Sequence, residues 1–496
     1  MNNPPIGLRC LLLAPILIAG LGFHEHVPNA QAAGHGASWH RFRGPNGSGV
    51  AEAADLPVKF DAGMNVAWKT ALPLGHSSPV VAGNRVFVTA FQDKDLLLVL
   101  ALDAETGRQL WRKEIVRDRA AAVANPYNNP ASPSPVTDGK NVYAFFQDFG
   151  LVSYSIDGVE RWRLALGPFR NNHGMGASPI LYGDLLIQVC DQDVGSYLLF
   201  VDKHSGRVRR RIDRSELLGA GYSTPAVYER AGHPPLLIAP GSFEMIAYRL
   251  DTGEKQWWLP GLPYSPRSVP VLAAESEGRD LVVMNVQTAV DGAGVDVPGY
   301  AELLSRYDAD KDGQLSPPEV KAYGLLAGGF AQIDIDGDGY VSRKEWEFRI
   351  DVFQIKNLLV AIRPDGRGNV STAGVAWKYR RSLPNVPSPI IYRNVLYLLK
   401  EGGIVTSMDP ATGRVYKQAR LSGALDPYFA SPVAGDGKLY MVSQTGKVVV
   451  VRAEADWEIL AINNLDEECF ATPAIAGDSL FVRTRSGLYR FREPKR

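Results

Sequence analysis

Short apolar runs recur along the chain, and turns rich in Gly, Asp and Asn separate them. One unit contains an aliphatic pair after Pro79, apolar runs at 86–88 and 96–102, a turn at 105–107 and a further run at 109–111. The runs show no helical periodicity, and short β-rich runs bounded by turn residues are typical of strands. Each such unit therefore predicts four short β-strands.

A repeated phrase opens each unit: a small residue, a proline and then an aliphatic pair. The prolines of this phrase are Pro79, Pro135, Pro179, Pro225, Pro270, Pro389, Pro432 and Pro473. Successive prolines lie 41 to 56 residues apart, except for one step of 119 residues. Four strands per forty-odd residues indicate the blade of a β-propeller. The predicted fold is all-β: an eight-bladed β-propeller, with an insertion where the long step falls in blade five.

The two ends of the chain predict how the ring closes. The last unit stops one strand short, whereas residues 65–69 form a strand-like run that precedes the first unit. Pairing the two would complete blade eight and cover edges that are otherwise exposed. We therefore expect an N-terminal closing strand that contains Trp68.

The chain divides into four predicted parts. Residues 1–33 form a signal peptide, because Arg9 precedes an apolar stretch at 11–21 and Ala30-Gln31-Ala32 offers a cleavage site. Residues 39–288 hold the closing strand and the propeller up to the first part of blade five, 289–352 the insertion, and 353–493 the remaining blades. The signal predicts a periplasmic or secreted protein, with no membrane span once it is removed.

Charge and cysteine content narrow the partners. Lys plus Arg and Asp plus Glu each number 53, so no net field favours nucleic acid. The one basic cluster, 207–211, falls where a solvated outermost strand is expected, and charge there guards the sheet edge. Cys10 is lost with the signal, and Cys190 and Cys469 are expected as two free thiols.

The long step contains two acidic loops, at 308–319 and 334–345. Each has Asp at positions 1, 3 and 5, Gly at position 6 and Glu at position 12, as in EF-hand calcium loops. The predicted calcium ligands are Asp308, Asp310, Asp312, Gln314 and Glu319 in the first loop and Asp334, Asp336, Asp338, Tyr340 and Glu345 in the second. Gln314 and Tyr340 occupy position 7, where the backbone carbonyl is the ligand. The sequence therefore predicts Ca²⁺ as the cofactor.

The two loops begin 26 residues apart, which is close for paired EF-hands. We expect short flanking helices at 300–307, 318–326 and 343–350, with an abbreviated turn at 330–333. Leu315 and Val341, at position 8 of each loop, are expected to pair as a short strand contact.

The turn-and-strand phrase at 101–111 carries a resemblance to a known family. It reads Ala-Leu-Asp-Ala-Glu-Thr-Gly-Arg-Gln-Leu-Trp, and weaker copies stand at 249–257 and 408–416. It resembles the repeat of the quinoprotein alcohol dehydrogenase-like propellers, called the PQQ repeat, and the opening 39–49 is similar to secreted members. In the repeat, Gly permits the turn and Trp packs adjacent blades. The tryptophans at that position are Trp68, Trp111, Trp162, Trp257, Trp377 and Trp457.

The resemblance implies the fold and leaves the activity open. Dehydrogenases of this superfamily use vicinal cysteines or a planar aromatic, a calcium-binding carboxylate and a catalytic aspartate. This chain has no adjacent cysteines, and its carboxylates do not map onto that set, so we assign no catalytic residue and do not expect pyrroloquinoline quinone (PQQ). Other members, such as the propeller subunit of the outer-membrane barrel-assembly machinery, bind protein partners.

Polar residues in the loops between blades predict a site at the mouth of the central channel, where a protein or a small-molecule ligand could bind. The candidates are His76, Asn125, Asn128, Asn129, Asn171, Asn172, His173, Tyr222, Tyr264, Arg267, Asp426, Tyr428, Glu467 and Glu468. The insertion should leave the propeller on the same face as these loops.

The sequence is compatible with three functions. A calcium-dependent binding or scaffold protein is favoured over an enzyme, with its ligand unknown. A PQQ-dependent oxidoreductase with its site at the channel mouth is one alternative. A scaffold for outer-membrane protein assembly is the other.

Overall fold

A computed structural model describes residues 1, 38–93, 96–117, 127–171, 173–214, 218–273, 280–294, 296–322, 330 and 333–494. The predicted signal peptide lies outside these residues apart from Met1, as do Asn125 and Asn172. The first compact unit of the chain, Met1–His35, is therefore not described further.

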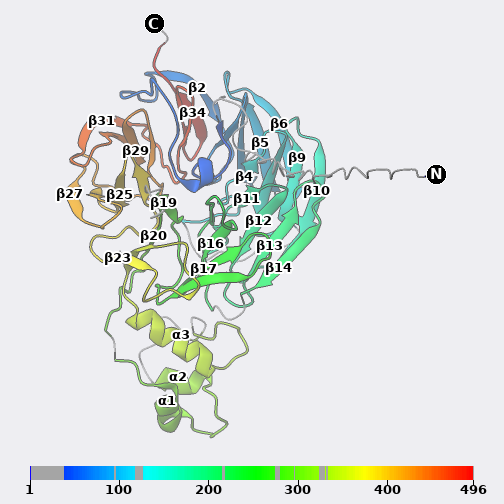
Figure 1. Cartoon of the computed structure of the whole chain (residues 1–496), viewed down its shortest axis with the longest axis vertical. Helices are drawn as coiled ribbons and strands as arrows, with labels where there is room; N and C mark the ends of the chain where they lie inside the picture. The colour runs from blue at the N-terminus through cyan, green and yellow to red at the C-terminus, as the bar shows by residue number, and fades with distance from the viewer. Residues whose placement is uncertain are drawn as a thin grey trace. The chain divides into compact units, whose positions relative to one another are not determined.

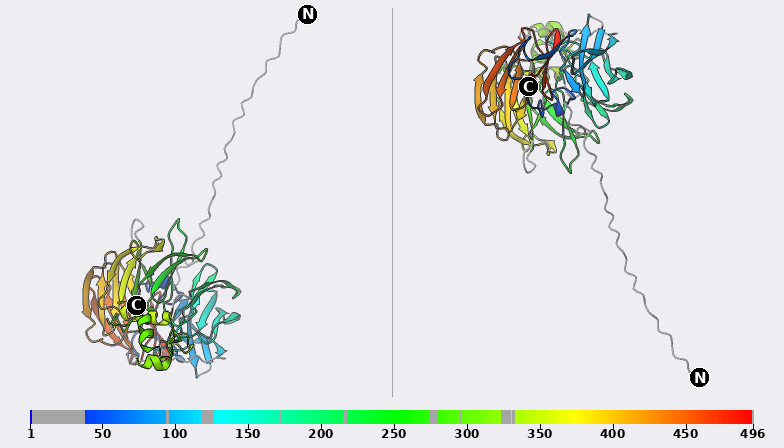
Figure 2. Two further views of the ribbon diagram at one scale, coloured as in Figure 1. Left: turned by 90° about the horizontal axis from the view of Figure 1, so that it is seen from below. Right: turned by 90° about the horizontal axis from the view of Figure 1, so that it is seen from above.

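Eight antiparallel sheets follow one another along the second unit, Gly36–Arg496, and form the blades of a ring (Figures 1 and 2). Blades one to four are built from these strands: β3 (Val80–Ala82), β4 (Arg85–Gln92), β5 (Leu96–Asp103) and β6 (Gln109–Val116); β7 (Val136–Thr137), β8 (Asn141–Phe146), β9 (Gly150–Ser155) and β10 (Glu160–Ala165); β11 (Ile180–Tyr182), β12 (Leu185–Cys190), β13 (Tyr197–Asp202) and β14 (Val208–Asp213); β15 (Ala226–Tyr228), β16 (Leu236–Pro240), β17 (Glu244–Arg249) and β18 (Lys255–Pro260).

Blades five to eight are built from these strands: β19 (Val271–Ala273), β20 (Leu281–Val286), β21 (Leu358–Ile362) and β23 (Val375–Tyr379); β24 (Ile390–Tyr392), β25 (Val395–Lys400), β26 (Ile404–Met408) and β27 (Val415–Arg420); β28 (Val433–Gly435), β29 (Lys438–Val442), β30 (Lys447–Arg452) and β31 (Glu458–Asn464); β32 (Ala474–Ala476), β33 (Ser479–Arg483), β34 (Gly487–Phe491) and β2 (Val66–Ala71). Two short strands add to this set: β1 (Ser38–Trp39) pairs with β3, and β22 (Gly368–Asn369) pairs in parallel with β18. The eight-bladed prediction is confirmed.

The predicted closing strand is also confirmed. β2 lies antiparallel to β34, with Val66 opposite Phe491 and Ala71 opposite Gly487, so the N-terminal strand completes blade eight (Figure 1). Trp68 is 8% exposed and its ring lies 5.9 Å from that of Phe481. Because Trp68 is buried while β2 pairs with β34, the ring joins through apolar burial as well as backbone pairing.

The repeated small residue before each proline explains how neighbouring blades are fastened. Its hydroxyl accepts a hydrogen bond from the backbone N–H of the same position in the preceding blade, as in Ser78 N to Ser134 Oγ at 2.9 Å. The same bond, at 2.9–3.0 Å, joins Ser134 to Ser178, Ser178 to Thr224, Val269 to Ser388, Ser388 to Ser431 and Ser431 to Thr472. Between blades four and five, where Val269 has no hydroxyl, Ser223 Oγ donates to Ser268 O at 2.7 Å. We call this set of buried bonds the hydroxyl belt.

The tryptophans of the repeat fasten the outer parts of the blades. In five of the six, the indole N–H donates to a turn carbonyl of the next blade: Trp68 to Ala104, Trp111 to Ile156, Trp162 to Lys203, Trp257 to Pro364 and Trp377 to Pro410, at 2.8–3.0 Å. The indole N–H of the sixth, Trp457, is buried without a hydrogen-bond partner among the described residues. Gly107 shows why the turn needs glycine: its φ is +72°, and an added Cβ would lie 2.6 Å from the Trp68 ring. The repeat motif is therefore a joint between blades.

Blade three lacks that tryptophan, and an arginine of the basic cluster takes its place. Arg210, on β14, donates to the carbonyls of Leu250 and Asp251 in the next blade, the second at 2.9 Å. The cluster thus lies on the outermost strand as predicted, and one of its members also joins two blades.

Residues 38–51, which include the opening 39–49, occupy the inner edges of the sheets. His40 O accepts from Thr137 N at 2.9 Å, and Arg41 Nη2 donates to Pro225 O at 2.8 Å. Arg43 Nη2 donates to Pro389 O at 2.8 Å, and Ala51 N donates to Ala434 O at 2.9 Å. This segment therefore touches the inner strands of blades two, four, six and seven, and we call it the axial segment.

The insertion leaves blade five between β20 and β21 and contains three helices, α1 (Tyr300–Tyr307), α2 (Pro317–Ala322) and α3 (Arg343–Gln354) (Figure 1). α1 matches the prediction, α2 begins one residue earlier, and α3 extends four residues further. α3 continues because Val352 is buried and Phe353 packs against the apolar core of the insertion. The predicted end of the second helix, 323–326, lies outside the described residues.

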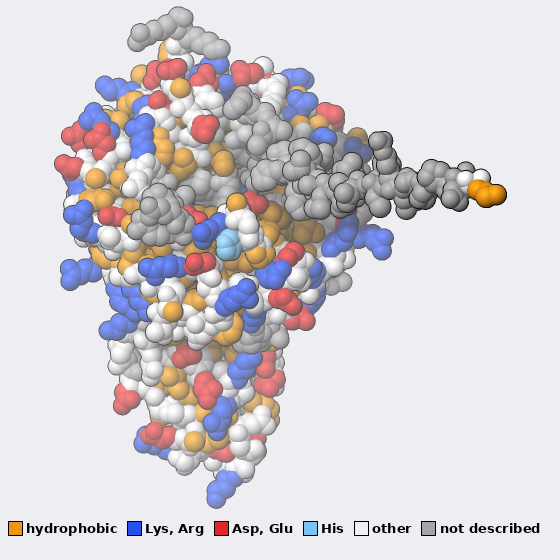
Figure 3. All heavy atoms as spheres, in the orientation of Figure 1, with side chains coloured by type: hydrophobic (Ala, Val, Ile, Leu, Met, Phe, Trp, Pro, Cys, Tyr) orange, Lys and Arg blue, Asp and Glu red, His pale blue; other side chains and the backbone are white. Residues whose placement is uncertain are grey.

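Basic and acidic side chains are interspersed over the face shown in Figure 3, in keeping with the zero formal net charge. Among the described residues, no helix is long and apolar enough to cross a membrane. Cys190 and Cys469 are buried free thiols, as expected.

Candidate functional site

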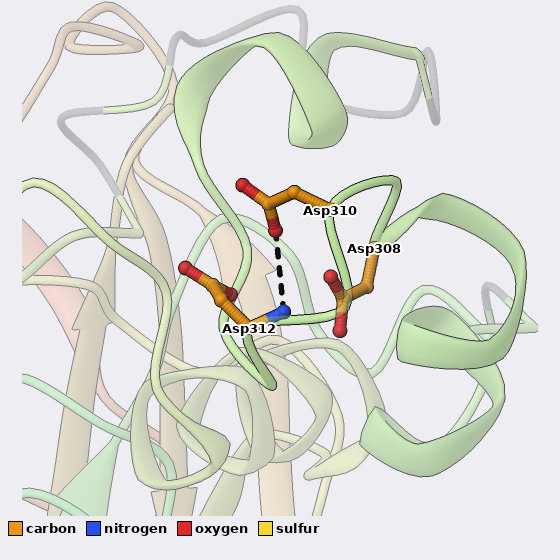
Figure 4. A group of neighbouring side chains, drawn as sticks. All are labelled: Asp308, Asp310 and Asp312. Atoms are coloured by element: carbon orange, nitrogen blue, oxygen red, sulfur yellow. Dashed lines mark hydrogen bonds between the residues drawn. The ribbon is translucent and has the colours of Figure 1, made fainter.

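The first acidic loop brings its three aspartates together. One oxygen from each of Asp308, Asp310 and Asp312 lies within 4.8 Å of the others, and the side chains converge in Figure 4. Gly313 N donates to Asp308 Oδ2 at 3.1 Å, and Asp312 N donates to Asp310 Oδ1 at 3.2 Å. These backbone bonds curl the loop around the converging oxygens.

The second acidic loop repeats this geometry residue by residue. Asp334, Asp336 and Asp338 form an equivalent cluster within 4.8 Å. Gly339 N donates to Asp334 Oδ2 at 3.1 Å, and Asp338 N donates to Asp336 Oδ1 at 3.2 Å. Two loops of different sequence therefore fold to the same local arrangement.

The glutamate at position 12 closes each loop. Glu319 accepts from Ala309 N at 2.7 Å and from Ser316 N at 2.8 Å, and Glu345 accepts from Ile335 N at 2.7 Å and from Ser342 N at 2.8 Å. The hydrogen bonds of Ser316 lower the pKa of Glu319 and favour its ionised form. Ser342 and Glu345 also form a capping box that starts α3, so the last residue of the second loop fixes the start of a helix.

The two loops lie back to back. Leu315 and Val341 form the predicted antiparallel bridge, with Val341 N donating to Leu315 O at 2.9 Å. A small apolar core lies beneath them: Val297, Tyr300, Leu303, Leu315, Val320, Ile333, Val341 and Trp346. We call residues 296–354 the calcium module, a name that states its proposed ligand.

A polar atom left without a partner tests whether a cation fits. Oδ1 of Asp308 and Oδ1 of Asp334, the first position of each loop, are buried and accept no hydrogen bond. A buried carboxylate oxygen without a donor is costly unless a cation or a proton meets it. Clustered carboxylate oxygens are the ligands that Ca²⁺ prefers, at about 2.3–2.6 Å. The residues present therefore fit calcium, with Asp308, Asp310, Asp312 and Glu319, and Asp334, Asp336, Asp338 and Glu345, as the side chains that would hold it.

The residues at position 7 fit the predicted backbone role. Gln314 is exposed, and Tyr340 is 37% exposed. Neither side chain belongs to the carboxylate clusters, so their carbonyl oxygens are the atoms that the prediction assigns to the ion.

Loops predicted to line the channel mouth enclose a cavity of about 390 Å³ between blades one, seven and eight. His76, Asn128, Asn129 and Glu468, all predicted, line it. His76 stacks on Phe470 with ring centroids 4.2 Å apart. Burial, with Arg483 nearby, lowers the pKa of His76 to about 4, so the imidazole is neutral near pH 7. Glu468 accepts from Gln444 at 2.9 Å and from Arg485 at 3.0 Å.

A second group of predicted residues lies at the loops of blades three to five. Tyr222 donates from its hydroxyl to Asn171 Oδ1 at 2.9 Å, and its ring lies 6.0 Å from His173 and 5.7 Å from the Arg267 guanidinium. Burial, with the positive charge of Arg267, lowers the pKa of His173. Asn128, from the first group, donates to His173 O, so the two groups are joined through one amide.

The remaining predicted mouth residues make contacts elsewhere. Tyr428 is fully buried and donates to Ala424 O at 2.8 Å, so placing it in the mouth was wrong: its ring belongs to the apolar core of blades six and seven. Asp426 forms an ion pair with Lys447 at 3.2 Å, and a carboxylate oxygen of Glu467 accepts a hydrogen bond from Ser486 N. Tyr264 packs on the calcium module, with its ring 6.2 Å from that of Phe348.

The sequence did not single out several residues of this region. Arg170 donates to Ile335 O at 3.1 Å and to Asp336 O, both in the second acidic loop. Phe348, on α3, lies edge-on to Phe243 at 5.2 Å. Asp191 and Arg214 form a buried ion pair at 3.5 Å in the loops of blade three. An arginine or a phenylalanine in a loop is common, and no pattern along the chain marks its distant partner.

Two profiles of known families match parts of this chain. A family profile described as "Outer membrane protein assembly factor BamB" matches residues 50–209 and 363–494, more than half of the chain. The chain belongs to this family. The break in the match contains the calcium module, and a profile of the EF hand matches residues 327–348, which include the second acidic loop. The resemblance to PQQ-repeat propellers is confirmed.

Solved structures show the same fold at low sequence identity. A europium-containing methanol dehydrogenase superposes with a TM-score of 0.65 at 10% identity, over 92% of this chain and 98% of the other. A quinohemoprotein alcohol dehydrogenase from Comamonas testosteroni gives 0.61 at 11% identity, over 94% and 83%. One from Pseudomonas putida HK5 gives 0.55 at 12% identity, over 92% and 81%. A sequence search of curated proteins finds no match.

Proposed function

We propose that the protein is a calcium-binding β-propeller of the periplasm or the cell exterior, and that it acts as a binding or scaffold protein. The observation that supports calcium most directly is the pair of acidic loops, each with three clustered aspartates and a buried oxygen of its first aspartate that accepts no hydrogen bond. A calcium ion held by these ligands neutralises carboxylates that otherwise repel one another. Affinities of roughly 0.1–1 mM suffice for calcium modules outside the cell.

Titration calorimetry on the calcium-free protein tests this function. Two ions should bind, and Glu319→Gln together with Glu345→Gln should abolish the binding, because position 12 supplies a bidentate carboxylate. Glu302→Gln, an exposed acidic change on α1 outside both loops, is the matched control. Unchanged heats in the double variant would refute the ligand assignment.

Membership of the propeller family favours a protein partner over a small molecule. The family description names an outer membrane protein assembly factor. A role as a scaffold in outer-membrane protein assembly is therefore the second candidate. Cross-linking in intact cells of the source organism, followed by mass spectrometry, should recover outer-membrane proteins with the propeller. A cross-link map without them would exclude this candidate.

We expect no oxidation of alcohols or sugars with PQQ. The described cysteines, Cys190 and Cys469, are isolated in blades three and eight, and the clustered aspartates proposed to hold calcium lie in the insertion. Reconstitution with PQQ and calcium, with dye reduction over a panel of alcohols and aldoses, is the measurement. Dye reduction that survives loss of both position-12 glutamates would instead establish the oxidoreductase and place its chemistry at the channel mouth.

A further inference from the structure

The second acidic loop contacts the propeller, and among the described residues the first loop makes no such contact. Arg170, in the connection between β10 and β11, donates to the carbonyls of Ile335 and Asp336. Its guanidinium lies against Gly337, where an added Cβ would come within 2.7 Å of Nη2. These acceptors are positions 2 and 3 of the loop, so a propeller side chain is hydrogen-bonded to the backbone of the loop itself.

The helix that begins at the end of this loop makes the second contact. Phe348 follows Glu345 by three residues on α3, and its ring is edge-on to Phe243 at 5.2 Å and to Tyr264 at 6.2 Å. It also covers Gly219, where a Cβ would lie 2.8 Å from the ring. Because Glu345 both closes the loop and caps α3, the position of Phe348 depends on the loop being closed.

The backbone of Arg170 also joins the loops predicted to line the channel mouth. Its backbone N–H donates to Gln192 Oε1 at 3.0 Å, and its carbonyl accepts from Asp193 N at 2.8 Å. The next residue, Asn171, accepts from the Tyr222 hydroxyl at 2.9 Å and from His173 N at 3.1 Å. His173 O then accepts from Asn128, which lines the cavity that contains His76. Contacts therefore run without a break from the second acidic loop to the cavity.

We propose that Arg170 is a positioning residue that couples calcium binding in the second loop to the order of the channel mouth. The inference rests on the proposed calcium binding. Without an ion, the carboxylates of Asp334, Asp336, Asp338 and Glu345 repel one another and open the loop. Calcium closes it and brings the carbonyls of residues 335 and 336 into register for Arg170. The first loop has no such contact in the described residues and stabilises the module alone.

Coupling of this kind is reciprocal: if calcium favours the Arg170 contact, the contact must strengthen calcium binding by the same factor. The positive charge of Arg170 acts in the opposite direction, because it repels a cation. Two substitutions separate these effects. Arg170→Lys keeps the charge but loses the forked geometry, and Arg170→Gln loses both.

The test combines calorimetry and hydrogen exchange on the full chain. In the wild type, calcium should slow exchange of the amides of Arg170, His173, Gly174 and Met175, which are hydrogen-bonded in the mouth. The slowing should persist in Glu319→Gln and vanish in Glu345→Gln. Arg170→Lys should weaken the second calcium site about fivefold, the low end for coupled sites because Arg170 is exposed. Arg170→Gln should weaken it less, because this change also removes a charge that repels the cation. Arg163→Gln, the same charge change on β10 away from the module, should leave both sites unchanged.

Each other outcome overturns a defined claim. Calcium binding at both loops with unchanged exchange in the mouth would refute the coupling and leave the proposed function intact. Tighter binding in Arg170→Gln with no change in Arg170→Lys would show that only charge matters. Absence of any calcium heat would overturn the proposed function and this inference with it. Thermal melting of each Arg170 variant verifies that the propeller is folded in these measurements.

Discussion

The propeller and the calcium module stabilise themselves in different ways. The blades bury continuous apolar clusters, and the hydroxyl belt and the tryptophan joints repeat the same fastening from blade to blade. The module has one small core and two clusters of like charges. The comparison teaches that burial and buried hydrogen bonds maintain the ring, whereas in the module the proposed calcium ions would offset the repulsion among the clustered carboxylates.

The sharpest way to break this comparison is to open the ring. Deletion of residues 38–72 removes the axial segment, the closing strand and Trp68, and leaves β34 with an unpaired edge. Removal of a large buried aromatic alone costs about 3–5 kcal/mol, so no stable monomer is expected. Size-exclusion chromatography and thermal melting are the measurements.

The control is the reciprocal deletion. Replacing residues 290–355 by a short glycine turn joins β20 to β21, whose ends Val286 and Leu358 are already opposite each other. This variant should remain a folded monomer that does not respond to calcium. A soluble, unshifted 38–72 deletion, or an unfolded module deletion, would contradict the distinction between the two regions.

The second prediction removes the cation from the module. In the wild type, each occupied site should stabilise the folded module by about 2.7 kcal/mol when calcium is present at one hundred times its dissociation constant. Scanning calorimetry should show that calcium shifts the module transition upward and leaves the propeller transition in place. Glu319→Gln with Glu345→Gln should abolish the shift. A propeller transition that follows calcium instead would show that the two regions unfold as one.

The third prediction tests the hydroxyl belt. Ser134→Ala removes the acceptor of Ser78 N in a fully buried position, which should lower the free energy of unfolding by about 1–3 kcal/mol. The loss should be equal with and without calcium. Ser134→Thr should restore stability, since Thr224 and Thr472 serve as acceptors elsewhere, and the exposed Ser422→Ala should have no effect. An alanine variant as stable as the wild type would mean that the belt merely accompanies packing.

The fourth and smallest effect concerns pH. Burial lowers the folded-state pKa of His76 to about 4, below its ordinary value of 6.5, so the unfolded chain takes up the proton first as the pH falls. The stability that His76 contributes is complete above pH 6.5 and declines between pH 6.5 and 4. We expect a loss on the order of 1 kcal/mol across that window. Thermal melting as a function of pH should show a shallower decline in His76→Phe, and no change in slope in the exposed control His233→Asn.

The repeat and the acidic loops were predictable because each is a local pattern. Pro79 and its seven counterparts mark the blades, and residues 308–319 and 334–345 carry their loop geometry within twelve residues. The axial segment could not be predicted in the same way, since Arg41 and Arg43 bond to carbonyls of Pro225 and Pro389, far along the chain. Tyr428 was misplaced because a tyrosine in a polar loop fits a mouth or a core equally well. Arg170 gave no signal because its acceptors are backbone atoms of another module.

The position of the closing strand has a consequence for how the chain is made. A polypeptide is synthesised from its N-terminus, and domains with distant contacts fold slowly. Residues 38–71 emerge early, yet their partners include Pro389, Ala434 and the strand β34, which emerge last. During elongation, β2 therefore has unpaired backbone groups while the later blades have not yet been synthesised. Pairing of β2 with other strand edges must therefore be avoided until β34 has been synthesised.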